Sequence, residues 1–145
     1  MGGRCSPALR VGGTLAFTYQ SESVKDRVIK LSKDFGTEIV IPCDVASDQE
    51  IERLFASLKG HWDGLDGIVH SIAYAPREQL DHDYLESVTR EGFRVAHEIS
   101  SYSLAALAKA GLGLMKGRDG AILTLSSLGA IRSVPRSWRP PRLPK

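Results

Sequence analysis

Polar residues follow several short apolar segments of this 145-residue chain. Asp44 comes directly after one such segment, and Ser126 and Ser127 end another. An aspartate at that place could contact the adenine side of a nucleotide. It could equally cap a helix that begins near Asp48, and periodicity leaves the two interpretations about even. A serine pair could polarise a substrate carbonyl, but serines also simply end strands, and without further context that second interpretation is favoured.

The histidines and cysteines show no metal-binding pattern. Neither an HExxH motif nor a CxxC motif occurs, and we interpret each histidine as a surface or packing residue rather than a ligand. The prediction is therefore no metal site. Two cysteines without such spacing fit a reduced, cytoplasmic setting. The residues concerned are His61, His70, His82, His97, Cys5 and Cys43.

The segments that must position these residues alternate between strand and helix patterns. Strand patterns, rich in β-branched and apolar residues, cover 14–19, 38–43, 67–71 and 121–126. Helix patterns cover 23–35, 47–59, a short turn at 83–88 and a long segment at 89–115. This β-α-β-α-β-α-β order predicts a parallel sheet with helices on both faces, a doubly wound, Rossmann-like layout. Ligands of such sheets bind outside the carboxyl ends of the strands.

Apolar spacing supports the first two helices. In the first helix, an apolar residue recurs on one face at Val24, Val28, Leu31 and Phe35, and Gly36 is a good stop residue. In the second, Ser47 and Glu50 have the spacing of a capping box. The apolar residues that follow it are Ile51, Leu54, Phe55 and Leu58.

The long segment 89–115 is rich in serine and alanine. High helix propensity alone explains this composition, and a subunit interface with closely approaching helices is the alternative. The small residues are Ser100, Ser101, Ser103, Ala105, Ala106, Ala108 and Ala110.

Composition excludes several classes of protein. Hydrophobic residues make up 42% and charged residues 25% of the chain, which is ordinary for a soluble globular domain and excludes whole-chain disorder. The sequence has no run of about 18 apolar residues, so we expect no membrane association. Residues 1–7 lack the apolar core of a signal peptide.

The net charge of +2 comes from the end of the chain. Residues 136–145 contain four of the 19 Lys and Arg residues and no acid, so the remainder has 15 basic and 17 acidic residues. The same ten residues contain three of the seven prolines. Four unpatterned charges among prolines are a poor nucleic-acid footprint, and we expect no nucleic-acid partner.

Six segments, taken in order, resemble a known family. They are 15–20, 43–45, 70–76, 88–93, 99–103 and 123–130. Together they closely resemble the bacterial enoyl-[acyl-carrier-protein] reductases (NADH), a divergent branch of the short-chain dehydrogenase/reductase superfamily. The resemblance covers about Ala8 to Pro135. No single segment is specific, whereas the ordered set is.

The resemblance implies a function and a set of site residues. The family uses NADH to reduce the double bond of a trans-2-enoyl thioester on acyl carrier protein in fatty acid biosynthesis, and its members form homo-oligomers. Gln20 would lie beside the adenosine ribose, and Asp44 and Val45 would contact adenine. Ile72 would line the nicotinamide side of the channel, and Ala75 would face the acyl substrate.

NADH is favoured over NADPH because no arginine or lysine adjoins Gln20 to bind a 2′-phosphate. Lys25 and Arg27 are nevertheless close in sequence and weaken this argument.

The sequence departs from the family at both ends and at Ser127. Residues 1–7 contain neither the expected first strand nor its glycine-rich turn. Beyond Pro135 the family has a Tyr and, seven residues later, a Lys, whereas this chain reads Arg-Ser-Trp-Arg-Pro-Pro over 136–141. Ser127 stands where the family usually has another Tyr and ordinary short-chain dehydrogenases have a catalytic Ser. It is the catalytic candidate, either with a hydrogen-bonding role or as a tolerated replacement.

These departures predict an incomplete Rossmann-like sheet that lacks the first strand and the catalytic helix. We expect an unmatched N-terminus at 1–7, a partial dinucleotide-binding domain at 8–135 and an unmatched Pro/Arg-rich tail at 136–145, hence a reductase truncated at both ends. Without a central strand, the two strand pairs either close up or expose unpaired edges. The expectation is a marginally stable, aggregation-prone chain that does not oxidise NADH with a crotonyl thioester.

Two alternatives stay open. One is a non-catalytic protein that binds a nucleotide, or a full-length homologue through its long helix. The other is a different short-chain reductase, suggested by the Ser-Ser-x-x-Gly spacing at 126–129 and opposed by segments 18–20 and 71–76.

Overall fold

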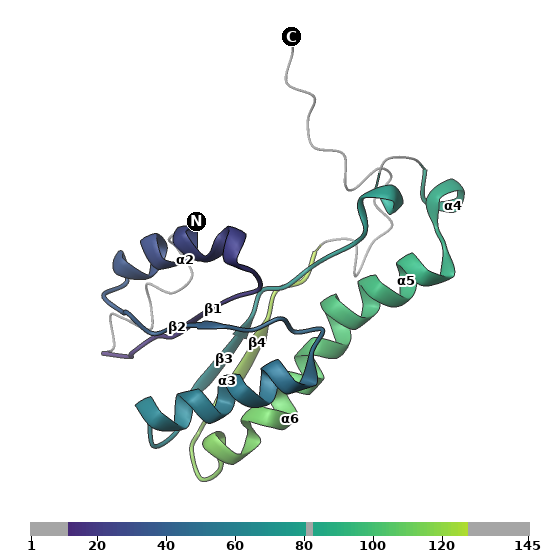
Figure 1. Ribbon diagram of the computed structural model, residues 1–145. Coiled ribbons are helices and arrows are strands. Elements are labelled where there is room, and N and C mark those ends of the chain that lie inside the picture. The colour runs from purple at the N-terminus through teal and green to yellow at the C-terminus, as the bar shows by residue number, and fades with distance from the viewer. Residues whose placement is uncertain (1–11, 81–82, 128–145) are drawn as a thin grey trace. The chain divides into compact units, whose positions relative to one another are not determined.

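The computed structural model describes residues 12–80 and 83–127. The expectations for 1–7, 136–145 and His82 lie outside these residues. The chain divides into two compact units between Gly64 and Leu65, and each unit contains one parallel strand pair (Figure 1). Among the described residues, none of the helices is long and apolar enough to cross a membrane.

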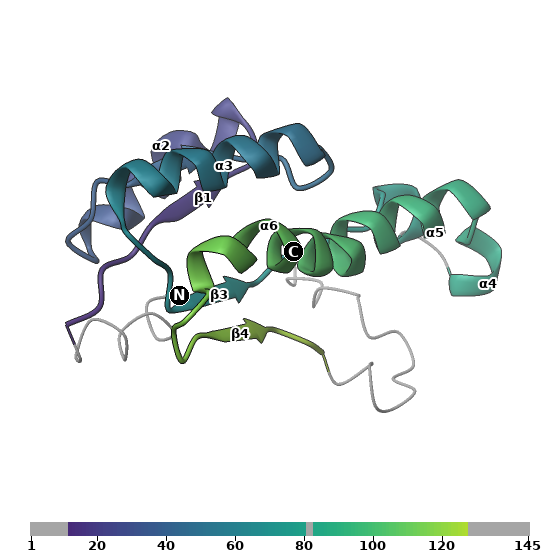
Figure 2. The same cartoon turned by 90° about the horizontal axis from the view of Figure 1, so that it is seen from below.

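The first unit has the predicted β-α-β-α order. Strand β1 (Phe17–Tyr19) pairs in parallel with β2 (Val40–Pro42), so that Tyr19 lies opposite Pro42. Helix α2 (Glu22–Lys33) connects the strands and α3 (Asp48–His61) follows them. The two helices lie on opposite sides of the strand pair (Figures 1 and 2), as expected of a doubly wound sheet.

Helix α2 begins one residue before its predicted start and ends two residues before its predicted end, and its apolar stripe is not a buried face. Gly36 has a φ of +66°, the left-handed conformation that favours glycine after a helix end. Val24 and Leu31, however, remain 39% and 37% exposed. The ring of Phe35 packs on that of Phe17, with centroids 5.5 Å apart. Two strands of three residues offer too little surface within the unit to cover a 12-residue helix.

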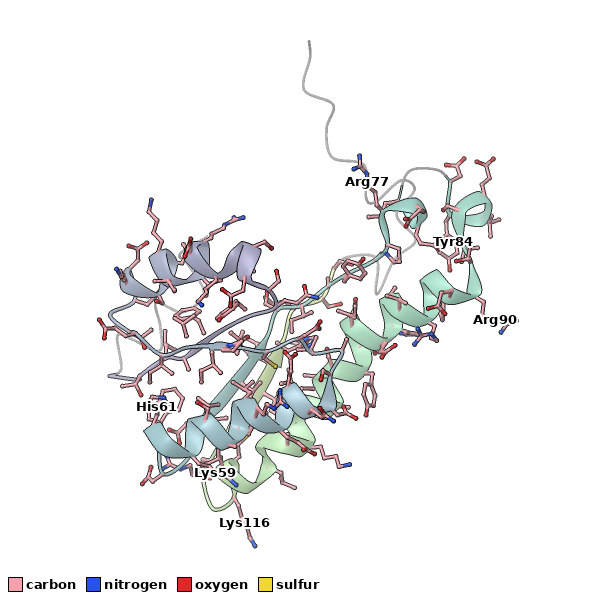
Figure 3. The ribbon with its side chains drawn as sticks, viewed as in Figure 1. Lys59, His61, Arg77, Tyr84, Arg90 and Lys116 are labelled. Atoms are coloured by element: carbon pink, nitrogen blue, oxygen red, sulfur yellow. The ribbon has the colours of Figure 1, made fainter. Side chains whose placement is uncertain are left out.

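Helix α3 confirms its prediction most closely. Ser47 accepts a hydrogen bond from the Glu50 amide at 3.3 Å, which satisfies one of the free donors of the first turn. The Glu50 carboxylate does not return to Ser47 as a complete capping box requires; it accepts from the Asp44 amide at 2.6 Å. The four apolar residues named above, Ile51, Leu54, Phe55 and Leu58, are all buried. The helix ends at His61, which is labelled in Figure 3.

The second unit also has a parallel pair, formed by β3 (Gly67–His70) and β4 (Ala121–Thr124), with His70 opposite Thr124. Between them come the 3-10 turn η1 (Arg77–Gln79) and α4 (Tyr84–Ser87). The predicted long helix then follows as three consecutive segments: α5 (Arg90–His97), the π-helical turn η2 (Glu98–Tyr102) and α6 (Ser103–Met115). Among the described residues each strand pair forms a two-stranded sheet of its own, which leaves strand edges unpaired.

Small side chains lie on the buried face of α6, which contacts β3. The Ser/Ala-rich composition therefore includes residues that allow this close approach, besides its effect on helix propensity. The strand β4 is exposed along its length, with Leu123 at 56%. The buried residues of α6 are Ser103, Ala106, Leu107, Gly111 and Leu114.

Candidate functional site

The first unit brings Gln20 and Asp44 together. Because β1 and β2 are parallel, their carboxyl ends share one edge, and the Cys43 amide extends the ladder by donating to the Tyr19 carbonyl at 2.8 Å. The next residues along each strand then meet: the Gln20 Nε2 atom lies 3.4 Å from Asp44 Oδ2. Gln20 is exposed and Asp44 half-buried, so both can reach a ligand.

Asp44 is held both by its own loop and by the first turn of the helix that follows. Its Oδ1 atom accepts from the Ala46 amide at 3.0 Å, and its own amide donates to the Glu50 carboxylate. Ser47, not Asp44, caps α3, so the capping interpretation of Asp44 is wrong. The carboxylate is preoriented with Oδ2 toward Gln20, and the half-buried Val45 follows it.

Glu22 forms an ion pair with Lys25, the lysine near Gln20 that weakened the sequence argument for NADH over NADPH. Lys25 Nζ lies 3.0 Å from the Glu22 carboxylate and 5.8 Å from the centroid of the Tyr19 ring. The Tyr19 hydroxyl donates to the same carboxylate at 3.4 Å. The hydrogen bond and the charge of Glu22 raise the pKa of Lys25 above its ordinary value. The ammonium therefore already has an anionic partner.

Cys43 is a buried packing residue beside this site. It is 4% exposed. Burial, followed by the negative charges of Glu50 and Asp44, raises the pKa of its thiol to about 11. The thiolate is the reactive form of cysteine, so Cys43 is an inert thiol near neutral pH.

The second unit contains the other three predicted residues. The carboxyl ends of β3 and β4 share an edge, where the Leu125 amide donates to the His70 carbonyl at 3.1 Å. Ile72 and Ala75 are half-buried in the segment after β3. Ser127 is exposed, three residues past the end of β4.

His70 is a buried residue whose hydrogen bonds the sequence did not predict. The ring is 2% exposed, with Nε2 2.8 Å from Ser103 Oγ and Nδ1 3.2 Å from Thr124 Oγ1. These two hydrogen bonds connect the ends of both strands to the start of α6. His70 itself comes directly before the segment that contains Ile72. Interpreting His70 as a packing residue is confirmed, but its isolated position in the sequence gave no signal for the two hydroxyl partners.

Two further links anchor the segment that carries Ile72 and Ala75. The Tyr74 amide donates to Ser100 Oγ at 2.9 Å, and that hydroxyl donates back to the Tyr74 carbonyl at 3.0 Å. Further on, Gln79 exchanges two hydrogen bonds of 3.2 Å with Thr89. Ser100 lies in the π-helical turn, a local distortion frequently found at functional sites.

The donor set fits the adenosine half of a dinucleotide. An amide and a carboxylate from adjacent strand ends can hydrogen-bond ribose hydroxyls and an adenine amino group. No cluster of three or more metal-ligating side chains occurs in the part of the chain that the structure describes. The parallel strands, the crossover helix and the order of the elements define an α/β protein of the Rossmann type.

The family follows from comparison with known proteins. Residues 5–138 match the family described as "Enoyl-(Acyl carrier protein) reductase", and the chain belongs to this family.

The relatives are curated enoyl-[acyl-carrier-protein] reductases [NADH] FabI. The chain is 55% identical to that of Neisseria meningitidis over 124 residues and 51% identical to that of Escherichia coli over 126. These matches cover 86% and 87% of this chain and 48% of each relative, so the chain spans about half their length.

Solved structures agree with this assignment. The enoyl-[acyl-carrier-protein] reductase (NADH) of Aquifex aeolicus has a TM-score of 0.86 and 45% identity, over 91% of this chain and 52% of that one. The Anaplasma phagocytophilum reductase in complex with NAD has a TM-score of 0.80 and 33% identity, over 87% and 47%.

Proposed function

We propose that this chain carries the adenosine-binding and substrate-side segments of an NADH-dependent enoyl-[acyl-carrier-protein] reductase that acts in fatty acid biosynthesis. The observation that carries the proposal is the pairing of Gln20 with Asp44 at the carboxyl edge of β1 and β2. The printed names of the relatives, which specify NADH, support the choice of cofactor.

In unit 1, Gln20 binds the adenosine ribose. Asp44 and Val45 bind adenine, with the carboxylate as acceptor and the Val45 side chain as apolar contact. The Ala46 and Glu50 bonds hold Asp44 in place before the ligand arrives, which reduces the entropy lost on binding.

In unit 2, Ile72 lines the nicotinamide side and Ala75 faces the acyl group. NADH, when bound, would supply a hydride for the β-carbon of the enoyl group, and this would place negative charge on the thioester oxygen. A hydrogen-bond donor aimed at that oxygen lowers the barrier. Ser127 is the catalytic candidate of this chain for that donor role.

The wider biological setting follows from the same proposal. The substrate is a trans-2-enoyl group on acyl carrier protein, the working protein is a homo-oligomer, and the compartment is the cytoplasm. The oxidoreductase class is that of enzymes acting on CH–CH bonds.

NADH titration of the 145-residue chain tests the cofactor assignment. Gln20→Ala and Asp44→Ala should each weaken NADH binding about tenfold, since each removes a polar contact. Glu38→Ala, at the amino end of β2, is the matched control and should leave affinity unchanged. Equal affinity in all four proteins would contradict the assignment.

A turnover assay separates the reductase from a protein that only binds nucleotide. We expect NADH to bind without reduction of a crotonyl thioester by this chain alone, because prolines occupy 140 and 141 where the family has a helix. Robust turnover would contradict the importance given to the family's Tyr and Lys.

A further inference from the structure

Glu22 is one of the charged residues at the carboxyl edge of unit 1. It is the first residue of α2 and follows Gln20 by two positions. The Tyr19 hydroxyl, which belongs to a residue only 7% exposed, donates to its carboxylate. A buried phenol is a fixed partner, so the carboxylate is anchored at the same strand end that carries Gln20.

The same carboxylate holds the cation that a 2′-phosphate would need. NADP-binding sites of this fold place a basic side chain beside the ribose. Lys25 is the basic residue that follows Gln20 first in the sequence, and two oxygens of Glu22 lie 3.0 and 3.3 Å from its Nζ. Arg27 lies two positions further along α2 and therefore on a different face of the helix.

The surrounding negative charges also disfavour binding of a 2′-phosphate. Asp44 lies against Gln20, and Glu50 binds the Asp44 amide, so three carboxylates lie around this edge with the Lys25 ammonium. A bound 2′-phosphate would add about two negative charges to this edge. A free ribose hydroxyl brings none and can donate to a carboxylate.

From these contacts we infer that Glu22 is a specificity-determining residue, which weakens the binding of 2′-phosphorylated nucleotides at this edge. It does so in two ways: it neutralises Lys25, and it adds a negative charge. This role rests on the nucleotide site proposed above and adds to it the residue that selects NADH over NADPH.

The test compares ligands that differ only in the 2′-phosphate. Adenosine 5′-monophosphate against adenosine 2′,5′-bisphosphate, and NADH against NADPH, are titrated calorimetrically into the whole chain and its Glu22→Gln variant at low ionic strength. The variant should improve the relative affinity for the 2′-phosphorylated ligand about twofold to fivefold, the range of an exposed charge pair. The improvement should shrink in 0.5 M salt because exposed charges are screened.

Two further variants identify the cause. Glu38→Gln removes the same charge at the amino end of β2 and should leave the ligand preference unchanged. The double variant Glu22→Gln/Lys25→Gln should lose part of the improvement, since the released ammonium is then absent. Circular dichroism of each variant confirms that it is folded.

The outcomes distinguish this role from the proposed function. An unchanged preference in Glu22→Gln, with NADH bound as in the parent chain, overturns the role of Glu22 and leaves the nucleotide site intact. An equal shift in Glu38→Gln, or a full shift in the double variant, also overturns it. If the parent chain binds none of the four ligands, both proposals are wrong.

Discussion

The Nε2 atom of His70 lies 2.8 Å from the Oγ atom of Ser103, and this contact defines the state of the ring. Ser103 donates its own proton to the Ile99 carbonyl at 2.6 Å, so its oxygen must accept from His70 Nε2–H. Nδ1 then accepts from the Thr124 hydroxyl at 3.2 Å. The network assigns a neutral imidazole with its proton on Nε2.

The first prediction concerns the pH dependence of this network. Burial lowers the pKa of His70 below its ordinary value of 6.5. The unfolded chain therefore binds a proton more readily than the folded chain, and the contribution of His70 to stability is complete above 6.5 and lost as pH falls toward the folded pKa. Urea unfolding should show a free energy that declines as the pH falls below 6.5.

Two glutamine variants control this experiment. His70→Gln removes the titrating ring and should flatten this decline, whereas His61→Gln, at the exposed end of α3 in Figure 3, should retain it. In an NMR titration, the shifts of the His70 ring protons should have their midpoint below pH 6.5. Titration of His70 above that value would contradict the assigned network.

The second prediction concerns Ser103, the acceptor in this pair. Ser103→Ala leaves the buried Nε2–H of His70 without its acceptor, and an unsatisfied buried donor costs about 1–3 kcal/mol. Ser101→Ala changes an exposed serine two residues earlier and should stay within about 0.5 kcal/mol of the parent chain. Equal unfolding free energies for the two variants, measured in urea, would show that the contact does not stabilise the fold.

Sequence patterns predicted the elements that local physical chemistry specifies. The apolar spacing and Ser47 cap of α3, the helix start near residue 89 and the alternating strand and helix order all appear in the structure. The stripe on α2 is present as a pattern, but two of its residues, Val24 and Leu31, are exposed. Spacing reports which residues share a side of a helix, not how much surface lies opposite that side.

In the candidate site too, some contacts could be predicted from the sequence and others could not. Parallel strand order predicts that Gln20 and Asp44 share an edge, and they lie within hydrogen-bond distance. The Tyr74–Ser100 and His70–Ser103 contacts join residues 26 and 33 positions apart, and no local pattern encodes such pairs. The roles given to Ile72, Ala75 and Ser127 stay predictions.

The third prediction concerns Gly92, which lies under the side chain of Gln79. A Cβ atom at Gly92 would come within 2.6 Å of Gln79 Nε2, so alanine there displaces the glutamine from its two bonds to Thr89. Alanine also favours the helix over glycine by up to about 1 kcal/mol. The loss of the bonds, about 0.5–1.5 kcal/mol each, offsets this gain.

The effect of Gly92→Ala on the unfolding free energy should therefore depend on whether Gln79 is present. Gly92→Ala should lower or leave unchanged the unfolding free energy of the parent chain, whereas in a Gln79→Ala background it should raise that energy by about 1 kcal/mol. Gly113→Ala, in α6 with nothing within 4 Å of the new Cβ, is the matched control and should stabilise both backgrounds equally. The same effect of Gly92→Ala in both backgrounds would show that Gln79 does not anchor its segment to α5, because the coupling between the two residues would then be zero.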